Sequence, residues 1–374
     1  MKIVQLRVRG LGPAPVTKWI KMQPGLNLVE FASPEAGKRF LQAVQTVNPP
    51  YDCRSELPFD DYPLQEKRDG YIRHISPEKR TIAMSVFNTE SDLVRELGAI
   101  TPLLYETDRI EVGRRLDNSR WVNFVEIASS TRWSEIDDQI RALRCSQTAK
   151  NSDTAEVDRL LKKIKKTDRI KGETAEILVA WLTACGQYHA ELAEAPDPID
   201  LLEAVRRAEL FSAGRTLVRK KLPLFILINP TAVACSHSVA EFSGDLGSML
   251  QLSDSKIIET GLHAVESYFP VELTGRLHRP VEQNSDTPAA IVPWAGFRPV
   301  KKIMLLCGAI ITYCLQRNET KPVFLLDLYT LPTDVAGDDF AAFLSALAEH
   351  CQCIGVIDKS KSMSDLIEKA ALQA

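Results

Sequence analysis

The stretch LNLVEFASPEAGKRFLQAV, residues 26–44, decides the expected fold. An apolar run ends in small residues, the pair Gly37-Lys38 comes next, and a helical pattern then begins. Phe40 and Val44 recur at helical spacing and belong to one apolar face. A strand, a loop and an amphipathic helix in this order are typical of a phosphate-binding loop, which holds phosphates with backbone N–H groups at a helix N-terminus.

Two positions depart from the loop pattern G-x-x-x-x-G-K-[ST]. Ala32 stands in place of the first glycine, and an alanine narrows the backbone freedom that a glycine gives. Arg39 stands in place of Ser or Thr, so it removes the hydroxyl that binds Mg²⁺ and puts a fixed cation there. In this register the candidate nucleotide-binding residues are Ala32, Ser33, Pro34, Glu35, Ala36, Gly37, Lys38 and Arg39.

Composition narrows the class of protein. The chain has 374 residues, enough for two or three domains or for one large α/β domain with an insertion. Its net charge of -3 argues against binding nucleic acid through overall charge. The basic stretch RLLKKIKKTDRIK, residues 159–171, leaves two interpretations open, a solvated helix face or a nucleic-acid patch.

Cysteine usage and hydropathy indicate the compartment. The eight cysteines are scattered without a disulfide framework, which predicts a reducing cytoplasm. The cluster HCQC, residues 350–353, lacks a second ligand pair at zinc spacing, so no metal site is predicted. No window reaches roughly 18 consecutive apolar residues, so no membrane association is expected.

Changes in pattern along the chain predict three parts: an N-terminal lobe at 1–145, a helical insertion at 146–234 and a C-terminal lobe at 235–374. Short alternating segments between 71 and 128 predict antiparallel strands. The apolar run KLPLFILINP predicts a buried strand inside the helical part. The last third alternates helices at 299–317, 337–350 and 362–372 with strands at 322–327 and 353–357, which predicts a parallel sheet covered by helices.

The N-terminal stretch MKIVQLRVRGLGP…GLNLVEFASPEAGKRF resembles the start of RecF- and SMC-type ATPases of the ABC class. In that family a first strand, a turn, a GLNLI-like strand and the phosphate loop come in this order. In the C-terminal lobe, Ala295-Gly296 stands where the signature glycine pair would be, and Asp327 ends an apolar strand as the metal-organising Asp does. Asp334 falls at the family's D-loop Asp, and Asp358 lies near its His position.

The resemblance covers 1–145 and 235–374 and rests on order and spacing, because no single motif is intact. It implies an α/β fold: a P-loop ABC-ATPase-like head with a mixed or parallel sheet flanked by helices, an antiparallel β-subdomain and a short helical insertion in place of the coiled coil. It adds Gly296, Asp327 and Asp334 to the expected nucleotide-binding residues. ATP is the implied cofactor, while Arg39 argues against Mg²⁺.

The departures from the family pattern predict a hydrolysis-deficient protein. Leu328 occupies the position of the glutamate that would activate the attacking water, and Asp358 replaces the His. Loss of such a base typically costs about 10²–10⁴-fold in rate. Asp327 is the one candidate catalytic residue. The resemblance implies head-to-head association with a second copy or with an intact ATPase or nuclease partner, in a DNA-linked process such as repair, segregation or defence.

Several alternatives stay open on the sequence alone. The chain could be an active ATPase that keeps Lys38 on the phosphates, or a scaffold that binds no nucleotide. The strand before Asn229 could replace the strand before Asp327 as the metal strand. We also expect Arg39 and Asp327 to pair with each other in place of the missing metal, because a partly buried carboxylate without a partner is costly.

Overall fold

The computed structural model describes residues 1–9, 16–50, 80–100, 108–127, 132–147, 154–186, 196–241, 254–270, 273–274, 293–329, 331 and 337–358. The chain forms two compact units. The first consists of Met1–Thr89, Glu111–Trp121 and Lys221–Ala374, and the second of Glu90–Ile110 and Val122–Lys220. The second unit therefore begins earlier, and ends earlier, than the helical insertion expected at 146–234.

A four-stranded parallel sheet forms the centre of the first unit. Its order is β3 (Leu26–Phe31), β9 (Gln352–Asp358), β8 (Val323–Asp327) and β7 (Phe225–Ile228). Every neighbouring pair in this order runs parallel. The strands predicted in the last third and in KLPLFILINP are confirmed, and their carboxyl ends meet at one edge of the sheet, where open α/β sheets bind ligands.

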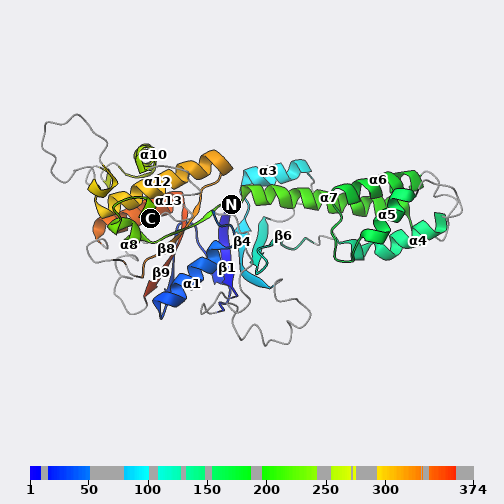
Figure 1. Ribbon diagram of the computed structural model, residues 1–374, viewed down its shortest axis with the longest axis horizontal. Coiled ribbons are helices and arrows are strands. Elements are labelled where there is room, and N and C mark those ends of the chain that lie inside the picture. Colours follow the sequence, from blue (N-terminus) through cyan, green and yellow to red (C-terminus); the bar gives the residue numbers. More distant parts are fainter. Residues whose placement is uncertain are drawn as a thin grey trace. The chain divides into compact units, whose positions relative to one another are not determined.

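Helices cover both faces of this sheet. On one face lies α1 (Pro34–Gln45), against which Val356 of β9 packs. On the other, Cys353 and Ile357 join the large core formed with α12 (Pro299–Asn318), α13 (Asp338–His350) and α10 (Asp254–Tyr268). Figure 1 shows α1 and the α12–α13 pair on opposite sides of β8 and β9. Alternate residues of a strand point to opposite faces, so β9 is buried on both sides.

An antiparallel sheet has the order β2 (Ile20–Lys21), β1 (Lys2–Val8), β4 (Thr81–Asn88), β5 (Arg109–Arg115) and β6 (Arg120–Phe124). Three of these strands match the predicted antiparallel section, whose first segment, 71–75, lies outside the described residues. The predicted α/β class, with parallel and antiparallel sheets and flanking helices, is confirmed.

The Gln352 side chain joins the two sheets of the first unit. Its Oε1 accepts from the Ile3 N–H at 2.8 Å, and its Nε2 donates to the carbonyls of Ile3 and Gln23 at 2.8 Å each. The partners are backbone groups of Ile3 in β1 and of Gln23 just after β2. The side-chain amide of Gln352 therefore satisfies backbone groups that a paired strand would otherwise satisfy.

The described part of the second unit is helical apart from the strand ends at its border. It contains α3 (Ser91–Ile100), η5 (Trp133–Glu135), α4 (Asp137–Gln147), α5 (Ala155–Lys163), α6 (Glu173–Gly186) and α7 (Pro198–Lys221). Within the unit, α4, α5 and α6 gather beside one end of α7 (Figure 1). Trp133, Leu178 and Val205 lie at the centre of their shared core.

Candidate functional site

The junction between β3 and α1 is where the phosphate loop was expected. Strand β3 ends at Phe31, and α1 already begins at Pro34, so Ala32 and Ser33 alone connect them. Ser33 has extended backbone, and its Oγ accepts a hydrogen bond from the Ala36 N–H at 3.2 Å. Serine is a favoured N-cap and proline a favoured first helical residue, so the sequence starts the helix here. The expected loop over 32–39 is therefore wrong from Pro34 onward, because those residues are helical.

The backbone N–H groups that would cradle phosphates are mostly occupied. The Ala36 N–H is taken by Ser33 Oγ, and the Gly37 N–H donates to the Ser33 carbonyl at 3.2 Å. Pro34 has no N–H at all. Glu35 is the one residue in the first turn of α1 whose backbone N–H is neither missing, as in Pro34, nor bonded to Ser33. The carboxylate of Glu35 already lies at the positive end of the helix, where a phosphate would bind. This junction does not fit a triphosphate in the manner of a phosphate loop.

Gly37 is explained by packing. It is buried, and a Cβ there would lie 3.3 Å from both Cβ and Cγ2 of Val356 and 3.6 Å from Phe31. The absence of a side chain lets α1 approach β9 closely. Close packing of α1 on β9 is therefore enough to explain why position 37 is a glycine, without a phosphate ligand.

Arg39 does not pair with Asp327, so the expected ion pair between them is wrong. The Arg39 Nε donates to Glu35 Oε1 at 3.0 Å, and a second guanidinium nitrogen donates to Gln42 at 3.4 Å. Residues three and four apart lie side by side on a helix, so α1 itself offers the nearer partners. With side-chain exposures of 38% and 59%, the Arg39–Glu35 pair is solvated.

Asp327 ends β8 and is half buried. Burial raises the pKa of its carboxyl, while a hydrogen bond from the Tyr329 N–H and the charge of Lys38 act in the opposite direction. The cation that stabilises ionised Asp327 is therefore Lys38, not Arg39. Lys38 is exposed, and its charge acts on the carboxyl of Asp327 at the carboxyl edge of the sheet.

Tyr329 was not predicted from the sequence, yet it lies at this edge. Its Oη donates to the Phe31 carbonyl at 3.0 Å, in a buried bond across the end of β3. Burial raises the pKa of the Tyr329 phenol, and Asp358 adds to the rise through its charge and a hydrogen bond. Asp358 itself is the register partner of Phe31. An aromatic two residues after the strand-ending Asp was the available signal.

The position expected to hold a catalytic base is in the core. Leu328 is fully buried, and its Cδ1 lies 2.9 Å from where a Cβ on Gly355 would be. A side chain here faces the packed interior and cannot activate water. Among the described residues no three His, Cys, Asp or Glu side chains gather as a metal site.

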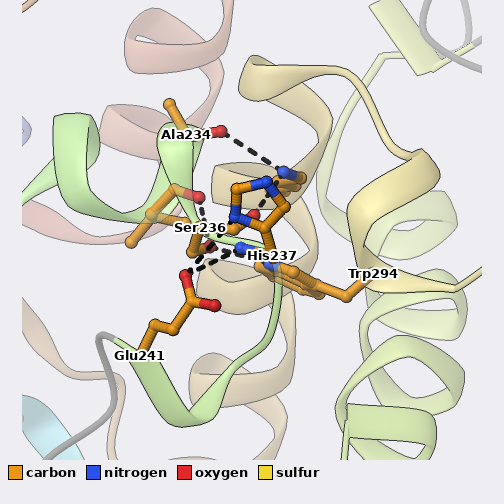
Figure 2. A network of polar contacts seen from close by, with 7 residues as sticks. Ala234, Ser236, His237, Glu241 and Trp294 are labelled. Atoms are coloured by element: carbon orange, nitrogen blue, oxygen red, sulfur yellow. Dashed lines mark hydrogen bonds and ion pairs between the residues drawn. The ribbon is translucent and has the colours of Figure 1, made fainter.

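The signature-like segment lies in a 3₁₀ turn, η7 (Trp294–Gly296), next to the end of α8 (Pro230–Cys235). The Trp294 Nε1 donates to Ser236 Oγ at 2.9 Å, and the Lys302 Nζ donates to the Ser236 carbonyl at 2.6 Å. Figure 2 shows this network around Ser236. These bonds fix the turn that carries Gly296. The D-loop candidate, Asp334, lies outside the described residues.

One described helix has the length and hydropathy of a membrane span, Pro299–Arg317 within α12, with a mean hydropathy of 1.2. Of that window 72% is buried inside the protein. Gly308 faces Ala264 of α10, and Gly261 of α10 faces Leu305, so close helix packing accounts for the apolar composition. We interpret α12 as the central helix of the first unit's core.

No protein-family model matches the chain, and no curated protein matches it. Among solved structures the chain is similar in fold to an SMC head domain from Thermotoga maritima, with 8% identity and a TM-score of 0.37, covering 99% of this chain and 92% of that one. A Pyrococcus furiosus SMC head bound to the C-terminal domain of ScpA gives 13% identity, a TM-score of 0.38, and coverage of 99% and 91%.

The recombination mediator protein RecF with ATP is 13% identical, with a TM-score of 0.33 and coverage of 96% of this chain and 92% of that one. At such identities no residue's role is carried over, so the chemistry of the site rests on the contacts of this chain's own residues.

Proposed function

We propose that this chain is a divergent SMC/RecF-like head that neither binds nor hydrolyses ATP at the β3–α1 junction and works through association with another head, either a second copy or an intact ATPase. The observation that carries the proposal is the start of α1 at Pro34, which replaces the phosphate cradle by a capped helix. Two further residues support it. Arg39 supplies no hydroxyl for Mg²⁺, and Leu328 is buried where a base is needed. The DNA-linked role implied by the order of segments belongs to the same proposal.

A second candidate function is nucleotide binding without turnover. It is favoured by one observation, that exposed Lys38 lies close enough to Asp327 for its charge to lower the pKa of that carboxyl. A cation at the carboxyl edge of a parallel sheet can attract phosphate even without a cradle.

A thermal-shift titration with ATP, with and without Mg²⁺, and a phosphate-release assay test both candidates. We expect no phosphate release and no shift in melting temperature, whereas a ligand at 100 times its dissociation constant would add about 2.7 kcal/mol of stability. A shift that disappears in Lys38→Ala, still without turnover, would replace the leading proposal by the second. Turnover that is abolished by Asp327→Asn would overturn both.

A further inference from the structure

A basic, aromatic edge runs along the antiparallel sheet of the first unit. The first 29 residues contain five cations, Lys2, Arg7, Arg9, Lys18 and Lys21, and no Asp or Glu. Strand β4, the next strand in the sheet, is also free of acidic residues. In a chain whose formal charge is -3, the strands β1 and β2 and the residues next to them therefore concentrate positive charge, and β4 adds no acidic residue.

The register places Trp19 beside this charge. Gln5 lies opposite Lys21 and Leu6 opposite Ile20, and Trp19 is the residue directly before β2. The Met22 N–H donates to the Val4 carbonyl at 2.9 Å, and the Thr17 N–H to the Val8 carbonyl at 2.8 Å, so the chain is bonded to β1 on both sides of Trp19. Arg7 lies two residues after Gln5 on β1, so Arg7 and Lys21 share one face of the sheet, and Trp19 lies next to β2 in the sequence.

These side chains are available to a ligand. Trp19 is 38% exposed, and it is the one large exposed hydrophobic in the described part of the first unit. Lys18 and Lys21 are exposed, and Arg7 is half-buried. Exposed ammonium groups on both sides of an exposed indole are placed to meet the phosphates of a strand whose base stacks on the ring.

We propose that this edge, formed by Arg7, Lys18, Trp19 and Lys21, binds single-stranded nucleic acid. An indole face stacks on any base, and cations beside it hold the phosphates, which together give binding with little sequence preference. An anionic membrane is the weaker fit, because one exposed aromatic inserts too little apolar area for stable anchoring. An acidic peptide strand fits less well, because β2 offers only the two paired residues Ile20–Lys21.

Nucleic-acid binding by this edge rests on the DNA-linked part of the proposed function and gives it a ligand and a surface. It does not depend on nucleotide, on association or on Lys38. The experiment therefore uses the full chain without ATP, so that failure of the edge and failure of the head-like function give different results.

The test is fluorescence anisotropy with a labelled oligo-dT of about 20 nucleotides, longer than the roughly 4–16 nucleotides that a single-strand site usually covers. We expect Trp19→Ala to weaken binding about 10-fold, and Trp19→Phe, which keeps a stacking face, to stay within about 3-fold of the parent chain. The double variant Lys18→Gln/Lys21→Gln should reduce the slope of log affinity against log salt by about 1.4. Lys256→Gln, an exposed cation on α10, is the matched control and should leave both values unchanged.

Three results would overturn the inference. One is no binding by the parent chain at about 100 μM, the weak end of non-specific affinity. Another is equal binding by Trp19→Ala and the parent chain. The third is binding of phosphatidylserine vesicles or polyglutamate, but not of oligo-dT, that Trp19→Ala abolishes. Circular dichroism and melting curves of each variant exclude unfolding as the cause. If oligo-dT binds but Trp19→Ala has no effect, the protein binds DNA through another surface, which keeps the DNA-linked role and contradicts the proposed edge.

Discussion

Two strand-to-helix junctions at opposite borders of the parallel sheet are built alike. After β3, Ser33 caps α1 and Pro34 is its first residue; after β7, Asn229 caps α8 and Pro230 is its first residue. Both caps have extended backbone. One junction was expected from the sequence to bind phosphates, and the other was expected only as an alternative metal strand.

The hydrogen bonds of the two junctions match. Ala36 donates to Ser33 Oγ at 3.2 Å, and Ala232 donates to Asn229 Oδ1 at 3.0 Å. A cap of this kind stabilises a helix by satisfying N–H groups that a bound anion would otherwise use. A strand, a short connection and a Gly-Lys in a helix are therefore not enough for a phosphate site, because the deciding factor is whether the N–H groups remain free.

The junctions differ in the residues after the cap. In α1 a buried glycine contacts the sheet, and an exposed lysine lies near Asp327. Substitutions at the glycine, at both caps and at Asp327 test whether the shared cap or this difference determines the properties of the β3–α1 junction.

The largest effect is expected from Gly37→Val. Its side chain would collide with Val356 and Phe31, and overpacking of this kind typically costs about 1–3 kcal/mol. Urea denaturation of Gly37→Val and of Gly186→Val measures the difference. Gly186 ends α6, and a Cβ there meets no atom of the described residues within 4 Å, so it is the matched control. Equal stabilities of the two variants would show that Gly37 is not a packing residue.

Removal of either cap should have an intermediate and equal effect. Ser33→Ala and Asn229→Ala are each expected to lose about 1 kcal/mol, as helix N-caps generally do. Ser33→Asn should restore most of that loss because it keeps a capping oxygen. Chemical denaturation measures all three variants. If Ser33→Ala left the free energy of unfolding unchanged while Asn229→Ala lowered it, the two junctions would not be capped alike. The phosphate-binding interpretation of the β3–α1 junction would then be open again.

The smallest effect, of opposite sign, is expected from Asp327→Asn. The folded pKa of Asp327 lies above its ordinary value of 3.8, so the folded state holds the proton more tightly than the unfolded state. The parent chain therefore loses stability as the pH rises from 3.8 through the raised pKa, and the amide does not. Melting curves should show Asp327→Asn to be the more stable at neutral pH, with the advantage vanishing in acid. A lower melting temperature of Asp327→Asn at neutral pH would contradict this.

The sequence was sufficient for elements with a strong pattern. Apolar runs such as VFLLD and CIGVI are short and alternate with helical patterns, which favours strands buried on both faces, and the helices between them are predicted by spacing. The parallel sheet and the α/β class could therefore be predicted. The strand at residues 26–31 and the helix that follows it could also be predicted.

The side-chain partners could not be predicted in the same way. Glu35 and Asp327 are the two acidic side chains that could pair with Arg39. Arg39 pairs with Glu35 because the helix begins at Pro34, which places Glu35 and Arg39 one turn apart on the same helix. The motif register counts Pro34 and Glu35 as loop residues, whereas capping chemistry makes them helical. The role of Tyr329 depends on the Phe31 carbonyl, which is far away in the sequence, so the aromatic residue two positions after Asp327 could mark the position but not its partner.

The pairing of β3 with β9 has a consequence for the synthesis of the chain. Leu26 is paired with Cys353, so β3 cannot be paired until residues 32–351, which separate it from β9, and β9 itself have been synthesised. Sheets closed by such distant segments have a high contact order and form slowly. The helical segments α4 to α7 need no such partner and can form earlier. Until β9 has been synthesised, β3 lacks its partner strand in the sheet, and an unpaired apolar strand is a site where aggregation can begin.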